Sequence, residues 1–167
     1  PGEGALDTRL ARAGYVRRDP TRLLAAPVAL LAEPPPRVTG FVVDWPPLEV
    51  QREIWDEGGT GPDRLAVMAR VRGPKRALLG RVSDRPAGTG FVACCGPVAM
   101  VHALEVRRAH RRQKSAVHMV RAAALWAQDQ GAVWLGLLVT EDNLPGRGLY
   151  AALGLGQVHG YHYRKPD

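Results

Sequence analysis

The chain has 167 residues, of which 46% are hydrophobic, and this is enough to bury a full core without disulfides or a structural metal. Its formal charge of +7 and its isoelectric point near 10.1 would suit a nucleic-acid partner. The arginines are scattered through most of the chain, however, and no zinc-finger, RRM or KH motif accompanies them. We therefore do not expect nucleic acid to be the main partner.

The cysteines, histidines and apolar runs favour a cytoplasmic protein without a metal. Cys94 and Cys95 are adjacent in a strand-like segment, and we interpret them as packing residues in a reducing compartment. The five histidines show neither HExxH nor Cys/His ligand spacing, so no metal site is expected. No apolar run is long enough to cross a membrane and no signal peptide is recognisable, which predicts no membrane contact.

The first 32 residues form a separate piece. Residues 6–15 are typical of a helix that ends at a glycine, and a strand is expected from there to about Leu31. The same order of helix, glycine and strand recurs around residues 148–155. We interpret residues 1–32 as the tail of a degenerate first half, whose upstream part precedes Pro1, and an unrelated helical arm is the alternative. The proline-rich residues 33–38 form a stiff joint to the main domain, residues 39–167.

The middle of the chain predicts two helices and then a hairpin. Leu48, Ile54 and Trp55 fit one helix, which the glycine-rich residues 58–61 end, and Asp63 is expected to cap the second. The segments 75–82 and 87–95 are then expected to be antiparallel strands joined by a turn.

A cationic turn follows the next apolar strand, residues 98–106. Residues 107–114 carry five basic side chains and no acid, and apolar residues then recur at helical spacing from Val117 to Ala127. A helix start offers unpaired N–H groups and the positive end of its dipole, so this turn suits a phosphate or pyrophosphate. A solvated basic loop is the alternative.

The last third predicts a strand, a short helix and a final strand. Residues 132–140 form a continuous apolar run that suits a strand covered on both faces. Capping side chains in residues 141–143 and a left-handed residue at Gly154 bound a helix over residues 144–153, and residues 157–164 form the last strand.

This order of elements resembles the GNAT superfamily of acyl-CoA-dependent N-acyltransferases over residues 37–165. The family's pyrophosphate loop is Gln or Arg, two free positions, Gly, one free position, then Gly or Ala. Residues 111–116 fill this frame, with Lys114 at the first glycine position. The second family signature is intact, and it consists here of Asn143, Gly146, Leu149 and Tyr150, followed by Leu153-Gly154-Leu155.

The resemblance implies an α/β fold with a mixed, mostly antiparallel central sheet flanked by helices. It implies transfer of an acetyl group from acetyl-CoA, without a metal, to a primary amine of a small molecule or peptide, and it leaves a homodimer open. A catalytically inactive CoA-binding or regulatory module is the alternative. The residues implied to bind the cofactor are Leu104, Val106, Arg111, Arg112, Gln113, Lys114, Ser115, Ala116 and Asn143.

The implied catalytic residues are Tyr150 and Glu105. A tyrosine phenol, with a pKa near ~10, can protonate the leaving thiolate, although Tyr150 could instead be a core aromatic. Glu105 and His102 are alternative bases, expected on opposite strand faces, and a water-relayed base is equally open. Asp56 and Glu57 could attract an amine or be ordinary solvated acids.

Lys114 is the departure from the family pattern. Glycine lets the loop backbone approach the pyrophosphate closely, whereas lysine supplies an N–H and a charge but occupies more room. We expect Lys114 to keep a helical conformation, which would preserve cofactor binding with altered affinity. A positive φ there would bring strain or a blocked cleft.

Overall fold

Seven strands form one sheet, in the order β2-β3-β4-β5-β6-β1-β7, in a computed structural model that describes residues 3–167. Neighbouring strands are antiparallel except for β5 and β6, which are parallel. The predicted mixed, mostly antiparallel α/β fold is therefore confirmed. The elements in chain order are α1 (Gly4–Arg12), β1 (Val16–Pro27), α2 (Val28–Ala32), β2 (Gly40–Val43), α3 (Glu49–Glu57), α4 (Pro62–Ala69), β3 (Lys75–Val82), β4 (Arg85–Cys95), β5 (Val98–Val106), the 3₁₀ turn η1 (Arg108–His110), α5 (Ser115–Asp129), β6 (Trp134–Thr140), α6 (Leu144–Ala152) and β7 (Gly156–Lys165).

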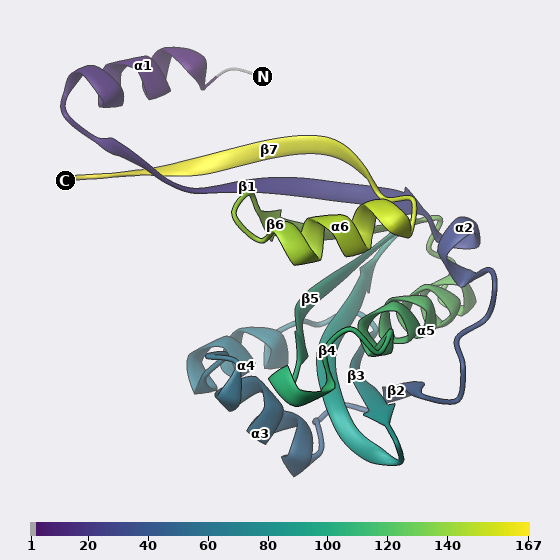
Figure 1. Ribbon diagram of the computed structural model, residues 1–167. Helices are drawn as coiled ribbons and strands as arrows, with labels where there is room; N and C mark the ends of the chain where they lie inside the picture. The colour runs from purple at the N-terminus through teal and green to yellow at the C-terminus, as the bar shows by residue number, and fades with distance from the viewer. Residues whose placement is uncertain (1–2) are drawn as a thin grey trace.

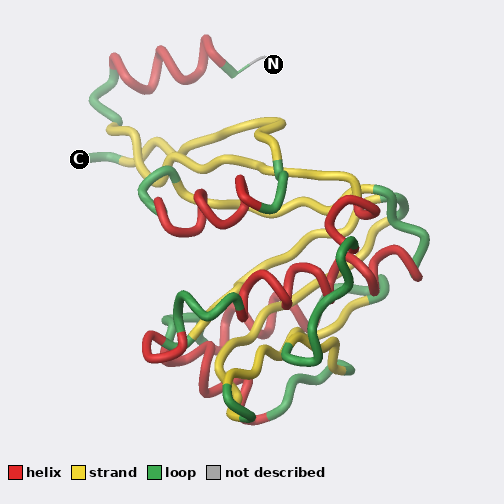
Figure 2. The backbone as a smooth tube through the Cα atoms, turned by 45° about the vertical axis from the view of Figure 1, so that its right-hand side comes forward, coloured by secondary structure: helices red, strands yellow, loops and turns green. Residues whose placement is uncertain are grey.

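Helices cover both faces of the β2–β5 part of the sheet. α5 packs on one face, with α2 beside it, while α3 and α4 lie on the other (Figures 1 and 2). α5 lies close to the sheet because its inward residues are mostly small and because glycines face it: an added Cβ on Gly40 would come 2.6 Å from the His118 backbone. A second, smaller core of Trp55, Met68, Ala77 and Phe91 lies under α3 and α4.

The sheet divides between β5 and β6. These two strands pair only over 98–101 and 134–137, and beyond that point their backbones diverge. Figure 1 shows β1, β6 and β7 leaving the β2–β5 part at an angle. Since α5 follows the end of β5 and α6 follows the end of β6, both helices begin at the open end of this wedge.

The predicted N-terminal strand lies inside the main sheet. β1 sits between β6 and β7 and is antiparallel to both. It ends at Pro27, not at about Leu31 as expected, because the following apolar residues have helical spacing. Val28, Leu31 and Ala32 bury one face of the short α2 against α5.

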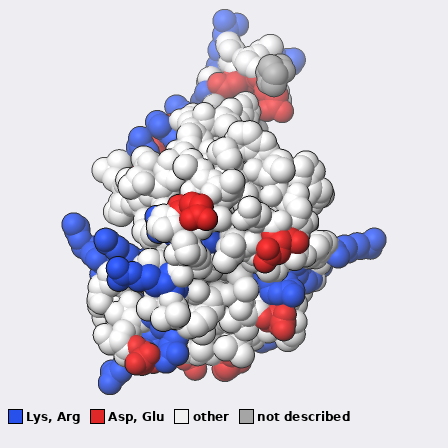
Figure 3. All heavy atoms as spheres, turned by 90° about the vertical axis from the view of Figure 1, so that its right-hand side faces the viewer, with Lys and Arg blue, Asp and Glu red and all other residues white. Residues whose placement is uncertain are grey.

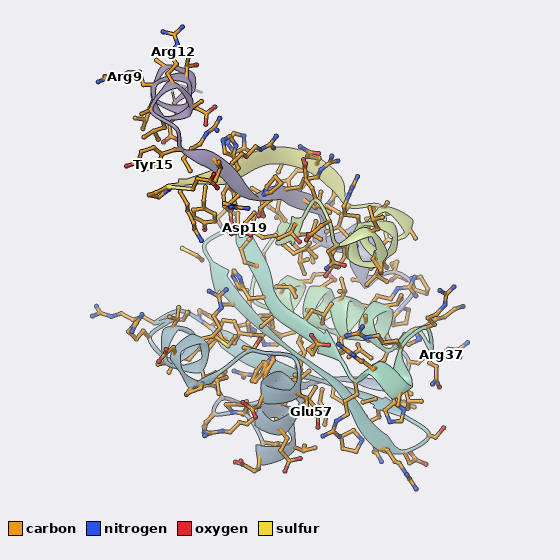
Figure 4. The ribbon with its side chains drawn as sticks, turned by 60° about the vertical axis from the view of Figure 1, so that its left-hand side comes forward. Arg9, Arg12, Tyr15, Asp19, Arg37 and Glu57 are labelled. Atoms are coloured by element: carbon orange, nitrogen blue, oxygen red, sulfur yellow. The ribbon has the colours of Figure 1, made fainter. Side chains whose placement is uncertain are left out.

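The N-terminal helix α1 stands off the body of the molecule (Figure 4). Leu6 is 54% exposed, and no residue of α1 is buried. α1 is instead tethered through Asp7, whose carboxylate accepts hydrogen bonds from Arg164 Nε at 2.7 Å and Arg164 Nη2 at 2.9 Å. His162 Nε2 lies 2.6 Å from the same carboxylate.

Breaking this tether should release α1 alone. The hydrogen bonds from Arg164 and His162 lower the pKa of Asp7, so the tether is complete above the ordinary aspartate pKa and weakens as the pH falls toward the lowered value. We expect Asp7→Asn to speed amide hydrogen exchange in residues 4–12, as measured by mass spectrometry, and to leave exchange in β1 unchanged. Asp19→Asn, which removes a second β7-facing carboxylate, is the control and should leave α1 protected. Slow exchange in α1 of the Asp7 variant would show that other contacts hold the helix.

Candidate active site

A β-bulge shapes the strand that borders the wedge. Ala103 of β5 has φ 46°, and the pairing of β5 with β4 shifts register between Thr89 and Phe91. The indole of Trp55 in α3 donates a hydrogen bond of 2.7 Å to the Ala103 carbonyl. A bulge adds one residue to a strand and so reverses which face the following side chains occupy. The fully buried Trp55 therefore fixes the place where this reversal occurs.

The bulge brings His102 and Glu105 to the same face of the sheet, so the expectation of opposite faces is wrong. His102 pairs with Phe91, and the two ring centroids lie 6.3 Å apart over the smaller core. Glu105 lies against the end of α3, where an added Cβ on Gly58 would come 2.6 Å from Glu105 Cγ. Both candidate bases thus face α3 and α4.

The two candidate bases differ in their hydrogen bonding. Glu105 Oε1 accepts hydrogen bonds from the Val106 N–H and from Arg111 Nη2, both at 3.1 Å. His102 forms no hydrogen bond within residues 3–167, and burial, together with the charge of Arg64, lowers the pKa of its imidazole. A neutral imidazole at pH 7 keeps a free lone pair that can accept a proton.

Two of the five cations in the turn form ion pairs with acids of the protein. The Arg107 guanidinium donates hydrogen bonds to both carboxylate oxygens of Glu57, at 2.8 to 3.2 Å, and this pairing lowers the pKa of Glu57. Arg111 binds Glu105 and also donates to the Val106 carbonyl at 3.0 Å. Glu57 is therefore an ion-pair partner of the turn, whereas the exposed Asp56 next to it forms no ion pair within residues 3–167.

Lys114 has φ 62°, so the expected helical conformation at this position is wrong. It is the N-cap of α5 and adopts the left-handed conformation that a glycine at this family position would take without cost. A lysine there carries strain of about 1–2 kcal/mol. No side chain caps α5, so the first N–H groups of the helix remain available to an anion.

Replacing Lys114 by glycine should separate strain from charge. We expect Lys114→Gly to raise the free energy of unfolding by up to about 1 kcal/mol, because relief of left-handed strain exceeds the entropy cost of glycine. Its affinity for acetyl-CoA should fall at low salt and match that of the unchanged protein at high salt, since the lost interaction is a screened charge. Lys114→Asn, which tolerates the same φ without a charge, should show the same salt dependence in calorimetric titration. Tighter binding of the glycine variant at both salts would mean that side-chain bulk limits the site.

α6 presents the residues of the second signature. Asn143 caps the helix by accepting the Gly146 N–H at 2.9 Å, and an added Cβ on Gly146 would come 2.8 Å from Asn143 Nδ2. The small residue at this position therefore makes room for the cap. Tyr150 is 8% exposed within the main core, forms no hydrogen bond inside residues 3–167, and has its pKa raised by burial.

The site residues gather on three elements around the wedge. Leu104 and Val106 lie on β5 beyond the last residue paired with β6, residues 111–116 lead into α5, and Asn143 and Tyr150 belong to α6. Within residues 3–167, no group of three or more His, Cys, Asp or Glu side chains could hold a metal ion. None of the helices in that range combines the length and apolar character needed to span a membrane.

Residues 31–155 match the sequence model of the Acetyltransferase (GNAT) family. The chain belongs to this family. GNAT structures are also its neighbours in fold: a GCN5-related N-acetyltransferase from Kribbella flavida is 20% identical with a TM-score of 0.70, over 98% of this chain and 65% of that one. A tandem GNAT protein from the clavulanic acid biosynthesis pathway is 21% identical with a TM-score of 0.66, over 100% of this chain and 60% of that one.

A shorter neighbour of this GNAT chain is the aminoglycoside 6′-N-acetyltransferase AAC(6′)-Ig from Acinetobacter haemolyticus, which is 15% identical with a TM-score of 0.59, over 77% of this chain and 97% of that one. The chain thus spans about two thirds or less of the length of the first two structures. No curated protein matches it in sequence. Family and fold together support acyl transfer as its general chemistry.

Sequence reasoning missed three features of this GNAT site. The bulge at Ala103 leaves no mark in the sequence, because alanine does not favour a positive φ. Trp55 supports this bulge through its hydrogen bond to the Ala103 carbonyl, so its role could not be predicted before the bulge was known. Arg37 and Arg121 are 84 positions apart, and only the fold brings them to one pocket.

Proposed function

We propose that this protein transfers an acetyl group from acetyl-CoA to a primary amine of a small molecule or peptide. The observation that carries the proposal is the wedge between β5 and β6, at whose open end two helices begin within a chain of the GNAT family. Unpaired strand backbone and uncapped helix N–H groups are the partners that an amide-containing, phosphorylated donor requires.

The donor would lie along β5. The backbone of Leu104 and Val106 does not pair with β6 and can line the pantetheine arm, although the Val106 N–H and carbonyl would first have to leave Glu105 and Arg111. A backbone N–H beside the thioester oxygen would stabilise the charge that develops there. The Oδ1 of Asn143 is used by the helix cap, so its amide NH₂ is the group left for the donor. The N–H groups of residues 114–116 would receive the pyrophosphate.

Two proton transfers accompany the reaction. The amine nitrogen attacks the thioester carbon and gives up a proton to a base, and then the C–S bond breaks and the thiolate takes a proton. His102 is the better placed base, since its imidazole is neutral and unengaged, whereas Glu105 is held by Arg111 and would act through its second oxygen or through a water. Tyr150 would protonate the thiolate, because burial keeps its phenol protonated at neutral pH.

The acceptor would enter from the face of α3 and α4. His102 and Glu105 both point to this face, and the exposed Asp56 adds an uncompensated negative charge beside it. A cationic amine is attracted by such a charge, although the effect is screened by salt.

The setting we propose is the cytoplasm. The adjacent Cys94 and Cys95 are both free, one buried and one exposed, and an exposed thiol fits a reducing compartment.

We also propose that residues 1–32 are the tail of a degenerate first GNAT-like half. α1 and α6 each lead to a left-handed glycine, Gly14 with φ 84° and Gly154 with φ 87°, and a strand begins two residues later in both cases. The two strands, β1 and β7, then pair antiparallel to one another. This repeated order supports a common origin for the two segments.

The test is amine-dependent release of CoA. We expect the free thiol, detected with a thiol reagent, to appear from acetyl-CoA only when an accepted amine is present in a panel of small amines and peptides with a free N-terminus or lysine. Release at the same rate without any amine would indicate thioester hydrolysis instead. Binding of acetyl-CoA with no release for any amine would favour the alternative, a catalytically inactive CoA-binding or regulatory module.

A further inference from the structure

Side chains of the protein itself occupy the backbone of Val106, beside which the pantetheine arm is proposed to lie. The Val106 N–H donates to Glu105 Oε1 at 3.1 Å, and the Val106 carbonyl accepts from Arg111 Nε at 3.0 Å. Arg111 Nη2 donates to the same Glu105 oxygen at 3.1 Å, which closes a ring of three residues. Acetyl-CoA that binds along β5 must open this ring, and the partly buried Glu105 carboxylate then needs another hydrogen-bond donor.

Arg111 is held differently from the cations at the edge of the molecule. Several Lys and Arg side chains drawn in blue in Figure 3 project into solvent. The Arg111 guanidinium instead folds back onto the end of β5, although its side chain is 56% exposed. An exposed arginine at the start of the proposed pyrophosphate loop can exchange these partners for phosphate oxygens, with which a guanidinium forms charge-assisted hydrogen bonds.

Thr89 of β4 offers a hydroxyl without a partner beside Glu105. Thr89 and Glu105 are register partners in the antiparallel pair of β4 and β5, so their side chains lie on the same face with their Cβ atoms about 5 Å apart. Thr89 is 0% exposed, and its Oγ1 has no hydrogen-bond partner in the described chain. A buried hydroxyl without a partner costs free energy, which a carboxylate that moves onto it would recover.

Both side chains point to the α3 side of the sheet. An added Cβ on Gly88 would lie 2.7 Å from a side-chain atom of α5 and 3.2 Å from Val106 Cγ2, so Gly88 and Val106 face α5. Thr89 and Glu105 are their immediate neighbours along the two strands and therefore face the other way. On that side Glu105 packs against Gly58 at the end of α3.

We propose that Thr89 is a positioning residue, whose hydroxyl receives the Glu105 carboxylate when acetyl-CoA takes over the Val106 backbone. The carboxylate is thereby held on the face from which the acceptor enters, beside His102, where it accepts a hydrogen bond from the attacking amine. The proposal rests on the proposed acetyl transfer and adds a residue outside both family signatures. The free protein and the acetyl-CoA complex therefore differ in the partner of one carboxylate.

The experiment compares Thr89→Val, which removes only the hydroxyl, with Thr89→Ser, which keeps it. We expect Thr89→Val to bind acetyl-CoA about 10-fold more weakly in calorimetric titration, since the complex loses a charge-assisted hydrogen bond. Its kcat with an accepted amine should fall by about 10-fold, because the amine is positioned less well. Its melting temperature should not fall, because the hydroxyl has no partner in the free protein. Thr89→Ser should restore the affinity and kcat.

Two control variants show whether the effect depends on Glu105. In Glu105→Ala no acceptor remains for the hydroxyl, so adding Thr89→Val should change neither the acetyl-CoA affinity nor kcat any further. Thr21→Val is the matched control, because it removes the same hydroxyl from a buried threonine of β1 that donates to the Asp19 carbonyl at 2.9 Å. It should lower the melting temperature and leave the acetyl-CoA affinity intact.

An unaltered acetyl-CoA affinity and kcat in folded Thr89→Val would overturn the inference and leave the proposed function standing. A loss that persists at the same size in the Glu105→Ala background would do the same. If the unchanged protein binds acetyl-CoA but acetylates no amine, the proposed turnover fails, and the affinities of the four variants in the cycle still decide the inference. A failure of the unchanged protein to bind acetyl-CoA would overturn both.

Discussion

Replacing Tyr150 by phenylalanine should lower kcat by a factor of about 10² to 10⁴ while leaving acetyl-CoA affinity nearly unchanged. Tyr150 is the predicted catalytic residue on α6, and its phenol proton is needed only when the thiolate departs. The side chain is 8% exposed and forms no hydrogen bond within the described chain, so the variant should fold with little loss of stability.

If Tyr150 is the acid, kcat should decline at alkaline pH, where the phenol loses its proton. Burial raises the pKa of Tyr150 above the ordinary tyrosine value near 10. The phenol therefore stays protonated through neutral pH, and the decline of kcat that depends on its proton should begin only above about pH 10. Steady-state kinetics of the Phe variant should lack this alkaline decline. Tyr161→Phe on the exposed surface of β7 is the matched control and should keep full activity. An unaltered kcat in Tyr150→Phe would remove Tyr150 from the mechanism.

Replacing Trp55 by phenylalanine should damage both stability and turnover. The indole is fully buried and is the hydrogen-bond donor to the Ala103 carbonyl at the bulge. Phenylalanine would leave that carbonyl without this donor and create a small cavity, which together cost about 2–4 kcal/mol in the free energy of unfolding. Since the bulge sets the positions of His102 and Glu105, we expect kcat/KM to fall by about 10- to 100-fold at a temperature where the variant is folded.

A core tryptophan away from the bulge separates the two effects. Trp126 of α5 is 8% exposed and belongs to the main core, so Trp126→Phe removes the same atoms from a buried site that does not support the bulge. We expect this variant to lose stability in chemical denaturation and to keep its kcat/KM. If the Trp55 variant retained the kcat/KM of the unchanged protein, the bulge would be unimportant for the chemistry.

The elements that the sequence predicts well are those with strong local signals. The apolar strand 98–106, the helix over residues 117–127 and the capped helix after Asn143 appear where expected, because capping, glycine stops and apolar spacing act over a few residues. The left-handed Gly154 is confirmed for the same reason. The second family signature is made of such local features.

The features that were missed depend on contacts between distant segments. The insertion of β1 between β6 and β7 is set by pairing over more than a hundred residues, which no local pattern encodes. The bulge at Ala103 is supported by the hydrogen bond from Trp55, which is distant in the sequence. The prediction that His102 and Glu105 lie on opposite faces of the strand was wrong because it did not include this bulge. The ion pairs of Arg107 and Arg111 likewise depend on where α3 and β5 end relative to the turn.

At Lys114 the family's sequence pattern and the backbone conformation explain one another. The family pattern marks its position as a glycine site, and the structure gives it the positive φ that explains why glycine is usual there. The lysine keeps the glycine-like backbone at the cost of strain and directs its charge to the pocket beside α6. Sequence alone offered both conformations, and the turn geometry decides between them.

The most direct test of this account is a crystal structure of the protein with acetyl-CoA. The account predicts the thioester between β5 and β6 beyond residues 101 and 137, with the pantetheine arm beside Leu104 and Val106 and the pyrophosphate at the start of α5. Electron density for the donor outside this wedge, or a wedge that stays closed at saturating acetyl-CoA, would contradict it.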